Sequence, residues 1–248
     1  MDAYDPQFIC NRSDVAGRYS FSEQPRVALW NLLRLAAPFQ SLIGSTDAIV
    51  DILNLFADEY RSTYANLMRH KLGLFNVAKD SDLSVVIEPL LALLQCAGAD
   101  YTLAMRALCD APMLLSQKDD PASIDRLVGR MASPDSSTDD SWSKDMRAFL
   151  ADVYKPRLLA DIDSNKSSPQ STAAQMRLTN PRFILRNWVA QDVISRAANG
   201  DDACIDRVLD MITTHAFSDS LPDHLKDEKA YGGPVPKWGK GLQSSCSS

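Results

Sequence analysis

Apolar residues recur every three to four positions along most of this chain, which is the spacing of amphipathic α-helices. The longest apolar stripe runs from Ile49 to Leu67 and holds this period over about five turns. Residues 45–47 supply a helix N-cap before it, and Gly73 ends it. Residues 83–98 are apolar almost all round, so we expect them to form a central, buried helix.

Shorter stretches of the same period predict further helices, and the polar stretches 133–140 and 164–172 predict loops between them. We expect a kink at Pro156, because proline disrupts a helix interior. No segment of four or more residues has the alternation of a strand bounded by turns. The predicted helices span about residues 25–38, 47–73, 83–98, 101–108, 122–131, 142–162, 181–198 and 202–217.

This pattern predicts a mainly α fold with irregular ends. We divide the chain into a loop-like segment at 1–24, a helical body at 25–217 and an irregular tail at 218–248. Composition agrees with an ordinary globular protein, since 45% of the 248 residues are hydrophobic and 23% are charged.

The net charge of -6 argues against a general nucleic-acid binder, which usually carries a basic surface. No apolar run reaches the ~18 residues that a membrane span needs. The first residues show neither the basic and apolar regions of a secretion signal nor the low acidity of a mitochondrial transit peptide. We therefore expect no nucleic-acid partner and no membrane span.

The five cysteines are widely and irregularly spaced, without a C-x-x-C pair, so a disulfide framework is not predicted. Cys96, Cys109 and Cys204 lie in apolar helical segments, and we expect them to be buried. Cys10 and Cys246 differ, because both lie in polar, non-helical segments near the ends.

A search for standard catalytic patterns finds none. His70, His215 and His224 are the only histidines, and no H-E-x-x-H or paired Cys/His ligand set occurs. No glycine-rich phosphate loop or G-x-S-x-G turn is present. We accordingly assign no catalytic, cofactor-binding or metal-binding residue from the sequence, and whether the chain is an enzyme stays open.

Three segments have unusually specific compositions. They read YDPQFICNRSD at residues 4–14, with GRYSF at 17–21 and LWNL at 29–32; NPRFILRNW at 180–188; and PKWGKGL at 236–242, with a terminal SCSS. In this order they resemble the C-terminal half of the selenoprotein O (SelO) family of protein adenylyltransferases. The resemblance covers essentially the whole chain, although residues 113–175 match only loosely.

The resemblance implies the helical C-lobe portion of a protein-kinase-like (pseudokinase) fold, with the N-lobe absent. Members of this family transfer AMP from ATP to Ser, Thr or Tyr hydroxyls of proteins, release pyrophosphate and use Mg²⁺ or Mn²⁺. Their ATP- and metal-binding residues lie upstream of the segment matched here. We therefore expect a C-terminal fragment that is inactive alone, with Met1 an internal methionine and the N-terminal half of the same protein as a partner.

By the same resemblance, residues 2–25 correspond to an activation segment. Asn11, Arg12 and Arg18 are then candidates for loop ordering or substrate contact, and an ordinary loop hydrogen bond is the simpler alternative for each. Cys246 stands where some members carry selenocysteine. The resemblance implies that Cys10 and Cys246 pair as a redox switch, and two unpaired thiols are the alternative.

Other expectations concern packing and location. We expect Trp30 and Leu33 in the core, Arg186 in an internal ion pair, and Trp238 in a docking or packed tail. The resemblance implies protein substrates, and a mitochondrial location in a eukaryote or a cytoplasmic one in a bacterium; the Ser/Asp-rich inserts favour the former. A non-catalytic helical interaction module and a thiol oxidoreductase are the alternative functions.

Overall fold

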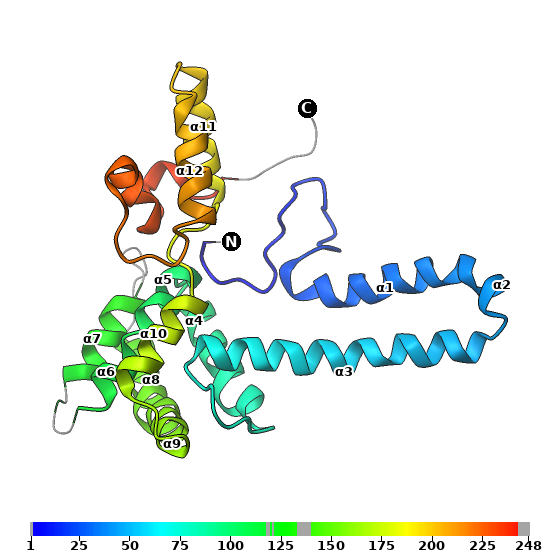
Figure 1. Ribbon diagram of the computed structural model, residues 1–248, viewed down its shortest axis with the longest axis horizontal. Helices are drawn as coiled ribbons and strands as arrows, with labels where there is room; N and C mark the ends of the chain where they lie inside the picture. Colours follow the sequence, from blue (N-terminus) through cyan, green and yellow to red (C-terminus); the bar gives the residue numbers. More distant parts are fainter. Residues whose placement is uncertain (1, 118–119, 121, 133–139, 243–248) are drawn as a thin grey trace. The chain divides into compact units, whose positions relative to one another are not determined.

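The computed structural model describes residues 2–117, 120, 122–132 and 140–242 (Figure 1). It is mainly helical, which confirms the predicted class. The described residues contain no strand, and Ala3 and Asp100 form an isolated antiparallel bridge. None of the helices in these ranges is both long and apolar enough to cross a membrane.

The described residues divide into two compact units by their contacts. Residues 2–4 and 69–242 form one, which we call the body, and residues 5–68 form the other, which we call the hairpin unit. The sequence-based boundaries at residues 24 and 217 were drawn where the helical pattern of apolar residues begins and ends. The boundaries of the two units are instead set by which residues contact one another in space. Each unit is described below by itself.

The hairpin unit consists of a loop followed by helices that run out and back (Figure 1). Proline at the second residue of α1 fits the first helical turn, where its missing N–H is not needed. Gly44 takes the left-handed conformation, with φ 73°, that ends α2. The elements are η1 (Phe21–Glu23), α1 (Gln24–Ala36), η2 (Ala37–Phe39), α2 (Gln40–Ile43) and α3 (Thr46–Lys71).

The body is built from short helices around a core that includes Leu90, Leu94, Leu108 and Leu150, all fully buried. The central position predicted for residues 83–98 is thus confirmed for the face that carries Leu90 and Leu94. The elements are η3 (Leu83–Ile87), α4 (Glu88–Cys96), α5 (Tyr101–Leu108), α6 (Ala111–Leu115), α7 (Ala122–Met131), α8 (Asp140–Ala148), η4 (Phe149–Tyr154), α9 (Lys155–Ser164), α10 (Pro169–Thr179), α11 (Asn187–Ala198), α12 (Ala203–Thr213), η5 (Asp223–Gly232) and η6 (Lys237–Gly239).

Two of these elements, η3 and η4, are π-helical turns, and each runs directly into a helix whose second residue is proline. Pro89 and Pro156 lack an N–H, and their rings crowd the carbonyl four residues back. Widening the preceding turn relieves this crowding without ending the helix. The irregularity predicted at Pro156 therefore takes the form of a π-helical turn just before it.

A buried ion cluster fixes residues 76–82 against α9. The Arg157 guanidinium donates to Asp82 at 2.7 and 3.0 Å and to Asp161 at 3.3 Å, while Asn76 N–H donates to Asp161 at 3.0 Å. Burial alone would raise the pKa of Asp82. Hydrogen bonds from Arg157 and from the Lys79 N–H outweigh burial and hold that pKa below its usual range.

The loop predicted at residues 164–172 is wrong from Pro169 onward, where α10 begins. Ser168 caps the helix, since its hydroxyl accepts from the Ser171 N–H at 3.0 Å while Ser171 Oγ accepts from the Ser168 N–H. Thr172, Ala173 and Met176 bury one face. The stretch looked like a loop because Ser and Thr serve both caps and loops.

The predicted helix at 181–198 begins later, at Asn187. The N–H groups of Arg182 and Phe183 both donate to the Ala216 carbonyl, which holds this stretch extended. The tail is also more ordered than predicted, with 3₁₀ turns in η5 and η6. It packs on α11 and α12 through a second core cluster: Phe183, Trp188, Val189, Val208, Met211, Leu225 and Tyr231.

Candidate functional site

The segment with most of the predicted site residues is a loop at residues 5–22 of the hairpin unit. Its base is closed by two backbone hydrogen bonds, from Phe21 N–H to the Phe8 carbonyl at 2.9 Å and from Ser22 N–H to the Pro6 carbonyl at 2.8 Å. A loop with paired ends is compact and can present side chains in a defined way. We call it the 5–22 loop.

Side-chain carboxylate and amide groups shape the interior of this loop. Asn11 Oδ1 accepts from the Ser13 N–H at 3.0 Å. Asp14 accepts from the N–H groups of Arg18 at 3.0 Å and Tyr19 at 2.7 Å. Such Asx interactions replace regular secondary structure where the chain turns. Asn11, a predicted substrate-loop residue, thus also makes a local structural hydrogen bond.

Arg18 lies against an aromatic ring. Its guanidinium carbon is 4.4 Å from the centroid of Trp30, and that of Arg34 is 4.9 Å from the same ring. Arg18 also lies 5.6 Å from the ring of Tyr19. Cation–π contacts of this kind hold a loop without burying it.

The expected core positions of Trp30 and Leu33 are wrong, because the two side chains are 41% and 49% exposed. The guanidiniums of Arg18 and Arg34 contact the Trp30 ring. The sequence did not single out Trp30 as a partner of Arg18. One sequence feature could have indicated that the Trp30 ring is a cation-binding surface. Arg34 follows Trp30 by one helical turn, so its guanidinium can reach the same ring.

Cys10 and Arg12 are both exposed, and Cys10 is a free thiol. Cys246 lies outside the described residues, so its pairing with Cys10 stays a prediction. Within the loop, Asp14 is already engaged by backbone N–H groups, whereas the Arg12 guanidinium reaches solvent. The loop therefore offers a cation and an accessible thiol.

The segment that leads into the loop is anchored on the body. Tyr4 N–H donates to the Ala99 carbonyl at 2.9 Å, and the Tyr4 and Tyr101 rings stack with centroids 5.7 Å apart. Asp100 caps α5 by accepting from the Leu103 N–H at 3.0 Å, and it receives the buried Arg186 guanidinium at 2.6 Å. The predicted internal ion pair of Arg186 is confirmed.

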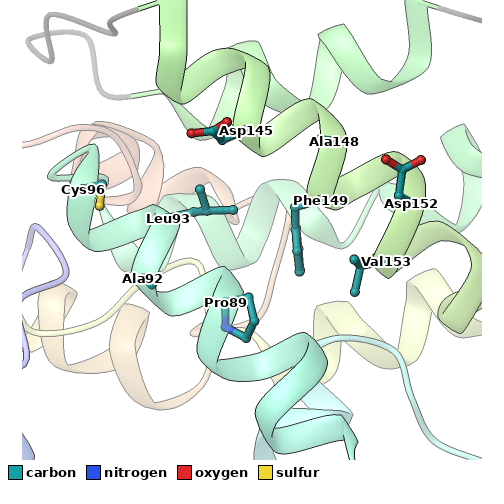
Figure 2. A pocket seen from close by; sticks show the side chains of 9 residues that line it. All are labelled: Pro89, Ala92, Leu93, Cys96, Asp145, Ala148, Phe149, Asp152 and Val153. Atoms are coloured by element: carbon teal, nitrogen blue, oxygen red, sulfur yellow. The ribbon is translucent and has the colours of Figure 1, made fainter.

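A second candidate site is a groove of about 500 Å³ between α4 and the helix formed by α8 and η4 (Figure 2). Leu93 and Phe149 lie between the two ribbons, and Asp145 and Asp152 project from the second one. Cys96 lines the groove and is exposed, so its predicted burial is wrong: it lies on the face of α4 turned away from Leu90 and Leu94. The remaining lining residues are Pro89, Ala92, Ala148 and Val153.

The other two cysteines that we expected to be buried, Cys109 and Cys204, are buried. Burial raises the pKa of the Cys109 thiol, which keeps it protonated and unreactive. Trp238 is half exposed within the body, with its ring edge-on to Trp188 at 6.2 Å. The accessible thiols among the described residues are therefore those of Cys10 and Cys96.

Clustered metal ligands and cationic side chains around a groove are the features by which a nucleotide–metal site is recognised. No group of three or more His, Cys, Asp or Glu side chains within them is placed to hold a metal ion. The groove beside Cys96 carries two carboxylates and no Lys or Arg among its lining residues, so it would repel a triphosphate. We derive no chemical step through ATP or a metal in this chain.

Comparison with known proteins gives the class to which this helical chain belongs. The sequence model of the family described as "Protein adenylyltransferase SelO" matches residues 1–213. Since this is most of the chain, the chain belongs to that family, and the predicted resemblance is confirmed.

Curated relatives share similarity along the whole chain. It is 38% identical over 249 residues to the "Protein nucleotidyltransferase YdiU" of Pseudomonas fluorescens (strain SBW25), and 35% identical over 252 residues to the protein of that name from Myxococcus xanthus (strain DK1622). Both alignments cover 100% of this chain and 45% of the relative. The chain thus spans a little under half the length of these relatives.

Proposed function

We propose that this chain is part of a protein adenylyltransferase that transfers AMP from ATP to Ser, Thr or Tyr hydroxyls of other proteins. In this transfer the hydroxyl gives up its proton to solvent and its oxygen bonds to the α-phosphorus of ATP. The bond from that phosphorus to the oxygen bridging the α- and β-phosphates breaks, and pyrophosphate leaves. The observation that carries the proposal is the family match over residues 1–213, together with relatives named as protein nucleotidyltransferases.

Because this chain spans less than half the length of its relatives, we propose which part of the reaction it serves. We place ATP and its Mg²⁺ or Mn²⁺ in the part of the polypeptide outside this chain, in a kinase-like fold to which these helices contribute the C-lobe. The described residues offer no cluster suited to that complex. The compartment stays a prediction, mitochondrial in a eukaryote and cytoplasmic in a bacterium, and cell fractionation tests it.

The 5–22 loop is our candidate for the substrate side of the reaction. Its closed base, its Asp14-centred turn and the Arg18–Trp30 contact make it a shaped loop, and Arg12 extends from it into solvent. A guanidinium there suits contact with carbonyl or carboxylate groups of a protein substrate.

The test compares this chain with the complete polypeptide of the same gene, both incubated with ATP, Mg²⁺ or Mn²⁺ and a protein mixture. We expect a mass increase of one AMP on target proteins with the complete polypeptide and none with the chain alone. ATP binding or self-modification by the chain alone would contradict our placement of the nucleotide site. An inactive complete polypeptide would contradict the proposed activity.

Redox control is the second part of the proposal. A disulfide oxidant would take two electrons and two protons from the thiols of Cys10 and Cys246 and join their sulfurs, restraining the 5–22 loop. Titration in denaturant counts five thiols in the reduced chain, and we expect two fewer after mild oxidation. Cys10→Ser should abolish this loss, whereas Cys96→Ser should leave it. Five thiols in both states would refute the pairing.

A non-catalytic interaction module is the other candidate, and the exposed apolar surface of the hairpin unit favours it. Intact mass measured from the native source separates the two functions. A protein that consists of these 248 residues alone supports the module, and a longer one supports the transferase.

A further inference from the structure

The groove between α4 and the helix formed by α8 and η4, which we call the α4–α8 groove, has two walls of matching periodicity (Figure 2). On both helices its lining residues recur at intervals of three and four, so each helix turns one stripe toward the groove. The indole N–H of Trp142, on α8, donates to the Leu93 carbonyl of α4 at 2.9 Å. The two walls are therefore bonded directly to each other.

The surface between the walls is apolar. Leu93 and Phe149 lie between the two ribbons, and Phe149 is largely buried (Figure 2). Ala92 on α4 and Ala148 on α8 are exposed, and their small side chains leave room for a close neighbour. A surface of this kind suits the apolar face of a third helix, whose side chains would fit between those of the two walls.

Two carboxylates edge this apolar surface. Asp145 and Asp152 are exposed, and neither forms an ion pair with another residue of the described ranges. Arg147, on the same helix, is already engaged by Asp125 at 2.5 Å. Lys144 does not line the groove. The groove therefore combines an apolar centre with two carboxylates that lack a cationic partner.

The spacing of the carboxylates indicates which ligand would match them. Asp145 and Asp152 are seven residues apart, which is about two helical turns or roughly 10 Å along the axis. A helix lying along the groove would present Lys or Arg to both of them from its positions i and i+7. Nucleic acid and anionic lipid are disfavoured, because the carboxylates repel phosphate groups.

We propose that the α4–α8 groove binds an amphipathic helix of a protein substrate. Lys or Arg at positions i and i+7 of that helix would face Asp145 and Asp152, and apolar residues at i+3 and i+4 would pack on Leu93 and Phe149. The inference rests on the proposed function, in which the complete enzyme modifies other proteins. A contact separate from the reacting hydroxyl raises the effective concentration of that hydroxyl at the enzyme.

The thiol of Cys96 reports on occupancy, since it is exposed and lines the groove. The probe is a synthetic peptide of about 15 residues with Lys at i and i+7 and Leu at i+3 and i+4 on an Ala background. At a peptide concentration about ten times the dissociation constant, N-ethylmaleimide should alkylate Cys96 about ten-fold more slowly. The rate at Cys10 should not change. A peptide with Glu in place of Lys should protect neither thiol.

Matched variants test the carboxylates and the apolar surface separately. Asp145→Asn with Asp152→Asn should raise the peptide concentration for half protection by about five-fold or more at low salt. Asp163→Asn with Asp206→Asn makes the same change of charge on exposed residues outside the groove and should have little effect.

A second pair of variants blocks the groove. Ala148→Lys places a bulky cation in it, whereas Ala160→Lys makes the same substitution on the exposed side of α9. In the complete polypeptide of the same gene, Ala148→Lys should lower AMP transfer to proteins that carry such a helix at least about five-fold, with ATP affinity unchanged. Ala160→Lys should leave both unchanged.

The peptide experiment needs no AMP transfer, so an inactive complete polypeptide would contradict the proposed function without deciding the binding result. The inference is overturned by equal protection from both peptides, by no protection, or by undiminished AMP transfer with Ala148→Lys. Cys96 that cannot be alkylated in the complete polypeptide would assign the groove to another part of the same protein. Alkylation that slows as the chain is concentrated would assign it to a second copy.

Discussion

Arg18 and Trp30 are separated by a loop and a helical turn, yet the guanidinium lies 4.4 Å from the ring centroid. Asp14 holds the backbone N–H groups of Arg18 and Tyr19, so the loop and the side chain support the same conformation. The structure thus gives Arg18, which the sequence offered only as a candidate, a specific partner in the Trp30 ring. Arg12 differs from Arg18 because its side chain is exposed without a ring contact among the described residues.

Arg18→Ala should loosen the 5–22 loop. An exposed cation–π contact contributes about 0.5–1 kcal/mol, so amides of residues 14–20 should open up to about five-fold more often. Hydrogen exchange by mass spectrometry measures this change. Arg12→Ala is the control and should leave the loop unchanged. Equal effects of the two substitutions would show that the ring contact does not hold the loop.

Glu228 predicts a pH dependence of stability. Its carboxylate is buried and accepts from Arg196 and Arg207, each at 2.8 Å. Burial alone would raise the pKa of Glu228, but these hydrogen bonds outweigh it and lower that pKa. A lowered folded-state pKa stabilises the protein above the unfolded-state value of about 4.3, and this contribution is lost as pH falls through the folded-state value.

Glu228→Gln should therefore lower the free energy of unfolding by about 2 kcal/mol at pH 7, because two guanidiniums lose a charged partner. The difference from the unsubstituted chain should shrink as pH falls below about 4. Urea unfolding at pH 7, 5 and 3 measures it. Asp163→Asn removes an exposed carboxylate and should cost little at any of these pH values. A constant difference for Glu228→Gln would contradict the ionic explanation.

At the scale of elements, helix ends decide how the segments meet. Gly73 follows α3 in the left-handed conformation, with φ 76°, and a Cβ there would lie 2.7 Å from Met176 Sδ and 3.2 Å from Leu158 Cδ1. A glycine is thus needed both for the turn and for close packing on α9 and α10. Gly200, at the end of α11, has φ 94° but no neighbour within 4 Å of a Cβ.

These two glycines form a matched pair of tests. Gly200→Ala adds backbone strain alone, about 1 kcal/mol, whereas Gly73→Ala adds the same strain and overpacking, about 2–4 kcal/mol in total. Urea denaturation of both variants measures the difference. A loss for Gly73→Ala no greater than that for Gly200→Ala would show that Met176 moves aside at little cost.

At the scale of the whole molecule, the two units differ in how much they bury. The body has apolar core clusters and buried ion clusters, whereas α1 and α3 of the hairpin unit each bury one residue. Stability is therefore expected to be uneven along this chain.

Limited trypsin digestion of the chain should show this unevenness. We expect early cleavage after Arg34 and Arg61 in the hairpin unit, and a fragment containing α4 to α12 that survives longer. Arg61→Gln should remove one early product, whereas Arg157→Gln should not, since Arg157 is buried in the body. Simultaneous loss of both units would indicate a single cooperative unit instead.

The sequence by itself determined the helical class, most of the longer helices and the family, because 3.6-residue periodicity and short specific motifs are local properties. It also placed Arg186 in an ion pair. Only the tertiary structure decided which apolar faces are covered. It left the side chains of Cys96, Trp30 and Leu33 exposed, although the sequence had predicted them to be buried. Burial depends on neighbours that are distant in sequence. The same amphipathic stripe therefore predicts a helix equally well whether its partner is at hand or lies elsewhere in a longer polypeptide.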